Sequence, residues 1–169
     1  VGDDWQSINR FAGADVSVMT QFETWFGKGK ILRLERSFRC PQSLCNVSSQ
    51  FIQKNPVQIK KNVISSQPED SPQSVEAFQV SSEDRIGNAI ENFLTDLYQR
   101  LAERASKATK NKKTIAFILG RYNKDEEYLP QNWKNKWQKL WGKLLTVTFC
   151  TVHRSKGLEA DYVILPRLV

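Results

Sequence analysis

Three polar stretches of this 169-residue chain combine residue types that could bind phosphate and nucleic acid. The segment Thr151–Glu159 holds the only histidine, His153, together with Arg, Ser, Lys, Gly and Glu, and strand-like runs lie on both sides of it. Backbone amides of such a loop can hold anions, and its glutamate can accept hydrogen bonds from ribose hydroxyls. With one histidine and no suitable cysteine spacing, a zinc site is not expected.

The second stretch, Gly2–Gly13, is a polar loop with a glycine at each end. It orders a carboxylate pair, a glutamine and an Arg–Phe pair. The glutamine, Gln6, can orient a water or touch a phosphate oxygen without supplying charge. An exposed Phe11 can stack on a base, which is worth roughly 1–3 kcal/mol in single-strand binders. Composition alone gives this loop little specificity, because acidic loops with glycine are common.

The third stretch, Leu34–Arg39, follows a short strand predicted over Ile31–Leu34. An arginine beyond the carboxyl end of a strand is well placed to meet a ligand at the sheet edge. The guanidinium fork also matches two phosphate oxygens. From the residues alone, however, Arg36 and Arg39 are better interpreted as surface charges.

The elements that must position these stretches alternate between strand and helix. Apolar residues at helical spacing predict the helices, and continuous or β-rich apolar runs predict the strands. This alternation predicts an α/β fold, a parallel sheet with helices on both faces. In chain order the predicted elements are a helix over Asp15–Phe26 capped by Asp15, the strand Ile31–Leu34, a helix from Pro41 to Ile52, a loop over Asn55–Ser74, the strand Ser74–Val80, a helix over Ile86–Leu101, the strand Thr114–Leu119, a less regular helical region over Lys124–Leu140, and the strands Leu145–Cys150 and Tyr162–Leu165.

Three tryptophans, Trp133, Trp137 and Trp141, recur every four residues and so share one helical face. Core packing is the favoured interpretation of this face. Base stacking is the alternative, and nothing else in the sequence supports it.

The composition limits the class of protein. The net charge of +7 favours a polyanionic partner such as nucleic acid, although a solvated basic surface also accounts for it. Much of the excess lies in Arg104–Lys113, interpreted as a helix end and linker. No apolar run approaches the roughly 20 residues of a membrane helix, so no membrane partner is predicted. An odd number of cysteines without metal spacing predicts thiols in a reducing, cytoplasmic setting.

The order and strand context of the three stretches resemble superfamily 1 helicases of the UvrD/Rep type. Gly2–Gly13 looks like motif III, Arg39 resembles the arginine of motif IV, and Thr151–Glu159 looks like motif V. The short spacing between Leu119 and Thr146 is most similar to the helicase IV branch, because most family members carry a large inserted subdomain there.

The resemblance implies an ATP-driven motor that translocates on single-stranded DNA and separates duplexes. Its nucleotide would sit between two RecA-like domains. Residues 1–14 would then be the tail of the first domain, carrying the motif III loop. Residues 15–169 would be the second RecA-like domain, a parallel sheet flanked by helices, incomplete at its C-terminus and without a large inserted subdomain. Family analogy also suggests 3′-to-5′ movement and a DNA repair setting.

The resemblance assigns the nucleotide-binding roles residue by residue. Gln6 is expected to sense the γ-phosphate. Arg39 is expected to act as the arginine finger, a role worth roughly 10³–10⁵ in rate in NTPases. Gly157 and Glu159 are expected near the phosphates and ribose. No residue of this chain is expected to bind a metal.

The DNA-binding roles follow in the same way. Thr151 and His153 are expected to touch the DNA backbone. Phe11 stands where the family has a base-stacking tryptophan, so its stacking should be weaker. Ala12 replaces an arginine common in that motif, which puts one contact in doubt.

Several parts of a complete motor are not found in these 169 residues. There is no Gly-x-x-x-x-Gly-Lys-[Ser/Thr] loop, no Walker B strand and no motif VI. The phosphate cradle and magnesium ligands are therefore expected in a missing N-terminal RecA-like domain. ATP with Mg²⁺ would be bound by the full-length parent, and this fragment alone is expected to be inactive. The alternative is a non-catalytic nucleic-acid-binding module with a RecA-like fold; the sequence before Val1 would discriminate the two.

Overall fold

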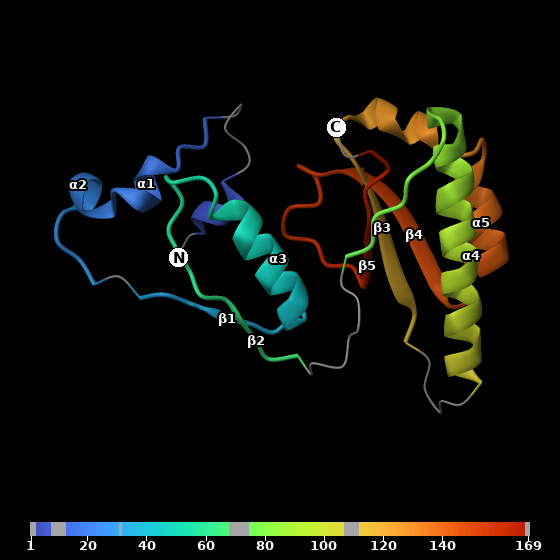
Figure 1. Cartoon of the computed structure of the whole chain (residues 1–169), viewed down its shortest axis with the longest axis horizontal. Coiled ribbons are helices and arrows are strands. Elements are labelled where there is room, and N and C mark those ends of the chain that lie inside the picture. Colours follow the sequence, from blue (N-terminus) through green and yellow to red (C-terminus); the bar gives the residue numbers. More distant parts are fainter. Residues whose placement is uncertain (1–2, 8–12, 31, 68–74, 107–111, 168–169) are drawn as a thin grey trace. The chain divides into compact units, whose positions relative to one another are not determined.

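The structure, a computed structural model, describes residues 3–7, 13–30, 32–67, 75–106 and 112–167. The chain divides into two compact units, Val1–Phe78 (unit 1) and Gln79–Val169 (unit 2) (Figure 1). Each unit pairs its strands in parallel and packs helices against them, so the predicted α/β class is confirmed. Within the described ranges, no helix combines the length and apolar character needed to cross a bilayer.

Unit 2 is built on a three-stranded parallel sheet. Its strands β3 (Thr114–Gly120), β4 (Leu145–Thr151) and β5 (Tyr162–Ile164) lie in the order β4-β3-β5. Thr114 pairs with Leu145, and Gly120 with Thr151. All three strands were predicted to within one residue at each end, because β3 and β5 are apolar runs and β4 is a β-rich run, each bounded by polar or turn residues.

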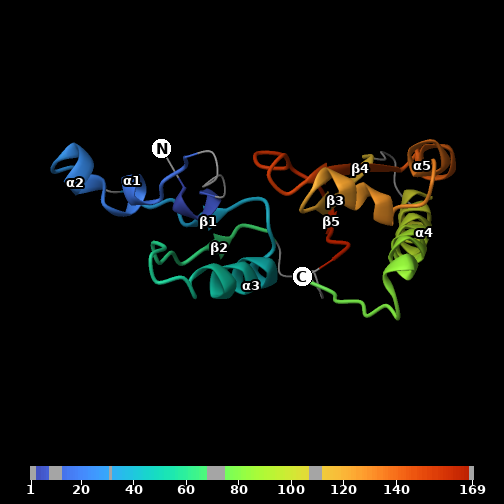
Figure 2. The ribbon, with the colours of Figure 1, turned by 90° about the horizontal axis from the view of Figure 1, so that it is seen from above.

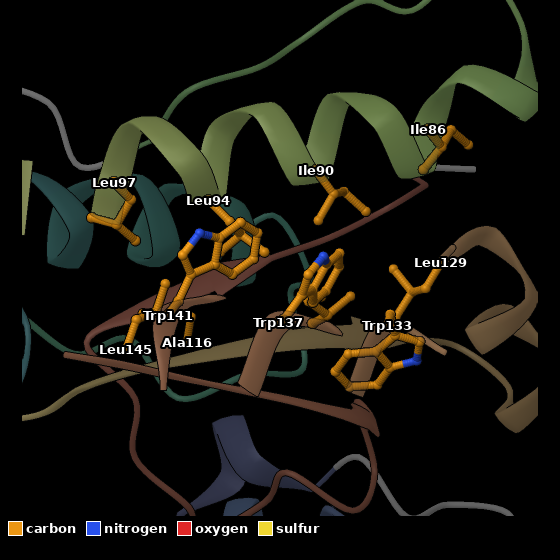
Figure 3. Packing of buried hydrophobic residues seen from close by; sticks show 11 residues of the cluster. Ile86, Ile90, Leu94, Leu97, Ala116, Leu129, Trp133, Trp137, Trp141 and Leu145 are labelled. Atoms are coloured by element: carbon orange, nitrogen blue, oxygen red, sulfur yellow. The ribbon is translucent and has the colours of Figure 1, made fainter. Parts of the chain in front are cut away.

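Two helices cover one face of this sheet. They are α4 (Ile86–Ala105), preceded by the 3₁₀-helix η3 (Glu83–Arg85), and α5 (Trp133–Trp141). The 3₁₀-helix η4 (Asn123–Tyr128) follows β3. The apolar face of α4 meets the tryptophan face of α5 over the sheet (Figure 3). The buried cluster consists of Ile86, Ile90, Leu94, Leu97, Ala116, Ile118, Leu129, Trp133, Trp137, Trp141 and Leu145.

The tryptophans are core residues, as predicted. Trp137 is 2% exposed, and its ring centroid lies 5.1 Å from that of Trp133 and 5.4 Å from that of Trp141. Side chains that alternate with Ala116 and Ile118 along β3 point to the opposite face, where Ile115 is 36% exposed. The helices of unit 2 therefore lie on one face of its sheet, not on both.

Unit 1 contains a short β-α-β arrangement. Strands β1 (Arg36–Ser37) and β2 (Ile64–Ser65) are parallel, and α3 (Gln42–Ile52) connects them. In the view from above, α3 runs beside β2 (Figure 2). One glutamine at the start of α3 ties the helix to this strand: Gln42 Nε2 donates to Val63 O at 3.0 Å, and Ser65 N donates to Gln42 Oε1 at 2.8 Å.

Two strands predicted for this half of the chain are wrong in the described residues. Residues 32–35 and 75–80 form no strand, and Leu34 is 83% exposed. Before β2, a side chain occupies a backbone group that a longer ladder would use: Asn62 N donates to Glu35 Oε1 at 3.2 Å. On the other side of the same segment, Lys61 O accepts from Gln53 Nε2 at 2.8 Å.

The helix predicted over Asp15–Phe26 forms in two pieces, α1 (Ser17–Thr20) and α2 (Phe22–Phe26). The predicted N-cap at Asp15 lies one residue too early: Val16 is the N-cap of α1 and makes no side-chain cap hydrogen bond, while Asp15 Oδ1 accepts from Ser17 N at 2.8 Å. The helix breaks at Gln21, whose φ and ψ are −118° and 38°. Its apolar face gains little burial, since Trp25 and Phe26 are 59% and 65% exposed.

Candidate functional site

The loop Thr151–Glu159 begins at the carboxyl end of β4. Val152 N donates to Gly120 O at 3.0 Å, which holds the start of the loop level with the end of β3. Turns then follow each other: Ser155 N donates to Thr151 O at 3.0 Å, and Leu158 N to Ser155 O at 2.9 Å. The loop is therefore an ordered continuation of the sheet edge.

Thr151 shapes this loop with its side chain. It is 8% exposed, and its Oγ1 accepts a hydrogen bond from Arg154 N at 3.3 Å. The hydroxyl hydrogen remains available for a ligand oxygen, because a hydroxyl both donates and accepts. His153, Gly157 and Glu159 all lie at exposed positions of the loop.

Position 157 favours glycine because of its backbone conformation, not because a side chain would lack room. Its φ is +83°, in the region that strains other residues. A Cβ added at this position would meet nothing within 4 Å. The chain can therefore approach a ligand closely here.

The far end of the loop is fixed at the opposite edge of the sheet. Asp161 N donates to Ile115 O at 2.9 Å, and Ile115 N donates to Asp161 Oδ2 at 2.8 Å. Gly120 and Ile115 lie five positions apart on β3, which is about 17 Å at roughly 3.3 Å per residue. The loop thus runs the length of β3. His153 lies near the carboxyl end of this strand, and Glu159 lies near its amino end, shortly before Asp161.

One cluster beside this loop was not predicted from the sequence. Tyr122 is 53% exposed, and the Arg121 guanidinium and Lys124 ammonium each lie 5.6 Å from its ring centroid. It adjoins the loop through the Val152–Gly120 hydrogen bond. The rule that selected Arg39, an arginine just beyond a strand, would also have selected Arg121.

Cys150 is buried next to Thr151 at the end of β4. Burial raises the pKa of its thiol, and the charge of Arg154 opposes this only in part. Its thiol is therefore largely protonated at neutral pH and supplies packing to the loop base, not a nucleophile.

In unit 1, Gln6 ends the 3₁₀-helix η1 (Asp4–Gln6). Its Nε2 donates to Asp3 Oδ2 at 2.8 Å, and Asp3 Oδ1 lies 2.6 Å from Lys61 Nζ. The same ammonium lies 2.5 Å from Asp4 Oδ1. We call these three charged residues the Asp3–Asp4–Lys61 cluster.

This cluster joins the N-terminal loop to the segment before β2. Asp4 is 1% exposed, and its Oδ2 accepts from Ile59 N at 2.7 Å. Trp5 Nε1 donates to Ile59 O at 3.0 Å, and Lys61 Nζ lies 5.0 Å from the Trp5 ring centroid. Gln6 therefore stands on a loop that is fixed on two sides.

Opposing effects set the pKa values in this cluster. Burial alone would raise the pKa of Asp3, but the hydrogen bond and charge of Lys61, with the hydrogen bond of Gln6, lower it. Burial would likewise lower the pKa of Lys61, but hydrogen bonds to Asp3 and Asp4 raise it. Asp3 and Lys61 are therefore charged near neutral pH.

Arg39 is exposed just after β1, and both its backbone neighbours are held. Phe38 O accepts from Gln67 Nε2, and Cys40 O accepts from Ser65 Oγ at 2.7 Å. Phe11 lies outside the described residues. Gln6 and Arg39 belong to unit 1, whereas Thr151, His153, Gly157 and Glu159 belong to unit 2.

The described residues contain no group of three or more His, Cys, Asp or Glu side chains that could hold a metal ion. Within each unit, the predicted residues and their neighbours instead offer hydrogen-bond donors and cations, and Tyr122 in unit 2 adds an exposed aromatic ring; such groups suit phosphate oxygens and bases.

Comparison with known proteins gives one informative match. Over 165 residues the chain is 33% identical to DNA helicase IV of Escherichia coli strain K12, which covers 98% of this chain. The chain spans about a fifth of that relative, 21% of its length. No family model matches the chain. The predicted resemblance to a UvrD/Rep-type helicase of the helicase IV branch is confirmed by this match.

Proposed function

We propose that this chain is the part of an ATP-dependent DNA helicase that carries its arginine finger, nucleotide-sensing residues and DNA-contact loops. The parent would translocate on single-stranded DNA and unwind duplexes. The observation that carries the proposal is the 33% identity to DNA helicase IV over 98% of the chain. A match of that length leaves out none of the three polar stretches.

Unit 1 would contribute the two residues that contact the γ-phosphate. Gln6 is a neutral donor and acceptor held by Asp3, and Arg39 is a cation whose flanking carbonyls are held by Gln67 and Ser65. Donors fixed before the reaction stabilise developing charge without reorganisation at that moment. These contacts suit the sensing and arginine-finger roles.

Unit 2 would contribute the DNA contacts and the link between DNA and nucleotide. Thr151 and His153 lie near the carboxyl edge, beside the basic and aromatic cluster around Tyr122. Gly157 and Glu159, farther along the same loop, would face the phosphates and ribose. Because the loop is anchored at both edges of the sheet, a displacement at one end would be passed to the other.

The described residues suit a nucleoside triphosphate in part. Arg39 and Gln6 can meet phosphate oxygens, but no carboxylate cluster in the described ranges suits Mg²⁺. Bound ATP would supply the γ-phosphoryl group whose hydrolysis drives the motor. We assign its cradle and magnesium ligands to an N-terminal RecA-like domain of the same protein, which would be the partner of this chain.

The test is Arg39→Ala in the full-length protein. DNA-stimulated ATP hydrolysis should fall by roughly 10³-fold or more, because a lost finger leaves transition-state charge uncompensated, while nucleotide affinity should change little. Arg36→Ala is the matched control, since Arg36 is equally exposed on the preceding strand. Unchanged turnover in Arg39→Ala would remove the finger assignment. A full-length protein that binds DNA without any DNA-stimulated ATPase would instead favour the non-catalytic module.

A further inference from the structure

One connecting segment, residues 58–67, holds the loops of both residues assigned to the γ-phosphate. At its beginning, Ile59 and Lys61 bind the loop that carries Gln6. At its end, Ser65 and Gln67 bind the carbonyls on either side of Arg39. The segment is thus a shared support for the two loops.

Within this support, Lys61 is linked to Gln6 through Asp3 by two successive contacts. Lys61 Nζ lies 2.6 Å from Asp3 Oδ1, and Asp3 Oδ2 accepts from Gln6 Nε2 at 2.8 Å. An amide that donates to a carboxylate turns its nitrogen toward that carboxylate. The orientation of the Gln6 amide is therefore set by where Asp3 is held.

We propose that Lys61 is a positioning residue for Gln6, acting through Asp3. The proposal rests on the proposed function, because it takes Gln6 as the residue that meets the γ-phosphate. Lys61 fixes the carboxylate to which the amide is bound, and it leaves the carbonyl oxygen and second N–H of Gln6 for a ligand.

Lys61 also sets the charge beside Gln6. Asp3 and Asp4 bring two negative charges to this loop, and Lys61 is the cation that contacts both. Without Lys61, the two carboxylates would lie uncompensated beside Gln6, which must approach a polyanionic phosphate. The carboxylates would then repel that phosphate. Lys61 therefore acts on both the geometry and the charge of the sensing loop.

Asp3 and Asp4 differ in their exposure and in the groups that they contact. Asp4 is 1% exposed and accepts from Ile59 N, so it holds the loop in place. The side chain of Asp3 is 40% exposed and is the partner of Gln6. Asp3 Oδ1 also accepts from Trp5 N at 3.2 Å and so caps η1. A change at Asp3 therefore removes the Gln6 contact and this cap but keeps the Asp4–Lys61 pair, whereas Lys61 takes no part in the cap.

The first part of the experiment reads the geometry directly, by NMR of the side-chain amide of Gln6 in the chain itself. Lys61→Met and Asp3→Ala should each shift this resonance and increase its motional averaging. Lys136→Met is the matched control, because Lys136 forms a comparable 2.5 Å ion pair with Glu91 in unit 2. A Gln6 amide signal that Lys61→Met leaves unchanged overturns the proposal, whether or not Asp3→Ala shifts it.

The second part measures steady-state ATP hydrolysis by the full-length protein. Lys61→Met and Asp3→Ala should lower kcat roughly 10- to 100-fold, the scale of a small misplacement of a reacting group, with little change in KM. Lys61→Arg should keep most of the activity, because it preserves the charge and the donors. Should Lys61→Met unfold unit 1, Asp3→Ala still gives both readouts.

Gln6→Ala separates this proposal from the proposed function. If Gln6→Ala leaves kcat unchanged, the sensing role of Gln6 fails, and the NMR shifts still decide whether Lys61 orients its amide. If Gln6→Ala lowers kcat but Lys61→Met and Asp3→Ala do not, Gln6 acts as proposed and the positioning role of Lys61 is wrong.

Discussion

The two units are held together by different kinds of interaction. In unit 2, eleven apolar side chains form one buried cluster between two helices and a sheet. In the described part of unit 1, Cys45 is the one buried apolar side chain, and the other buried residue is Asp4. Side chains of Gln42, Gln53 and Asp4 instead bind backbone groups of residues 59–65.

This difference separates the properties of the two sets of site residues. The loop Thr151–Glu159 lies between strands that pack into an apolar core. Its anchors are mostly backbone hydrogen bonds, and the Asp161 carboxylate is the charged contact at the far end. Gln6 and Arg39 stand on loops held by polar contacts, whose strength depends on the charges nearby. Unit 1 is therefore the part in which a change of charge, such as a phosphate arriving or leaving, would alter the structure more readily.

The largest effect that would test this comparison is the loss of the central tryptophan of unit 2. Trp137→Ala should destabilise the unit by about 3–5 kcal/mol, because it removes a large buried side chain that contacts the tilted indoles of Trp133 and Trp141. Trp137→Phe should cost much less, since Trp137 Nε1 has no hydrogen-bond partner in the described structure. Urea unfolding followed by far-UV circular dichroism measures both.

Trp25→Ala in unit 1 is the control for tryptophan removal as such. Its side chain is 59% exposed, so the free energy of unfolding should change by less than about 0.5 kcal/mol. Equal losses in Trp137→Ala and Trp25→Ala would mean that the apolar core does not distinguish the two units.

The sequence was sufficient to predict the core of unit 2. Trp133, Trp137 and Trp141 repeat at helical spacing, the run that became β3 is continuously apolar and the run that became β4 is β-rich, so local pattern and burial agree. The prediction of a strand over Ile31–Leu34 was wrong, because residues 32–34 pair with no neighbouring strand. Asn62 N, which a longer ladder would use, donates to the side chain of Glu35 instead.

The candidate site was predicted unevenly for the same reason. The loop Thr151–Glu159 lies between two strands and has a distinctive local composition, so the sequence located it. The Asp3–Asp4–Lys61 cluster joins residues 58 positions apart, and no local pattern reports a contact of that separation. The sequence alone therefore does not predict this cluster. It could have predicted Arg121, because that arginine, like Arg39, lies just beyond a strand.

The second test concerns the buried carboxylate of unit 1. Asp4→Ala should destabilise unit 1 by about 2–4 kcal/mol, because it removes a partner of Lys61 and leaves Ile59 N without its acceptor. Asp4→Asn should cost less, since its amide oxygen can still accept from Ile59 N. Urea unfolding measures both.

Asp84→Asn in unit 2 is the control for loss of a carboxylate. The Asp84 side chain is 77% exposed beside Arg85, and its replacement should leave the unfolding midpoint nearly unchanged. If Asp4→Ala were as mild as this control, the polar contacts would not be what stabilises unit 1.

The smallest expected effect is the dependence of unit 1 on pH. The pKa of Asp3 is lowered below its ordinary value of 3.8 in the folded state. Its ion pair therefore adds stability above pH 3.8, and this contribution is lost as the pH falls through the lower, folded value. The pKa of Lys61 is raised above 10.5, so its contribution is present below pH 10.5 and is lost only as the pH rises past the folded value.

Between these limits the contribution of the pair should be constant. Because the side chain of Asp3 is 40% exposed, solvent screening limits it to about 0.5–1 kcal/mol. Urea unfolding of the wild-type chain and of Asp3→Asn should give a difference that is flat near neutral pH and shrinks below pH 3.8. A difference that stays constant throughout the acid range would show that Asp3 does not need its charge here. The Gln6 amide would then be held by a hydrogen bond alone, and Lys61 would act mainly through Asp4.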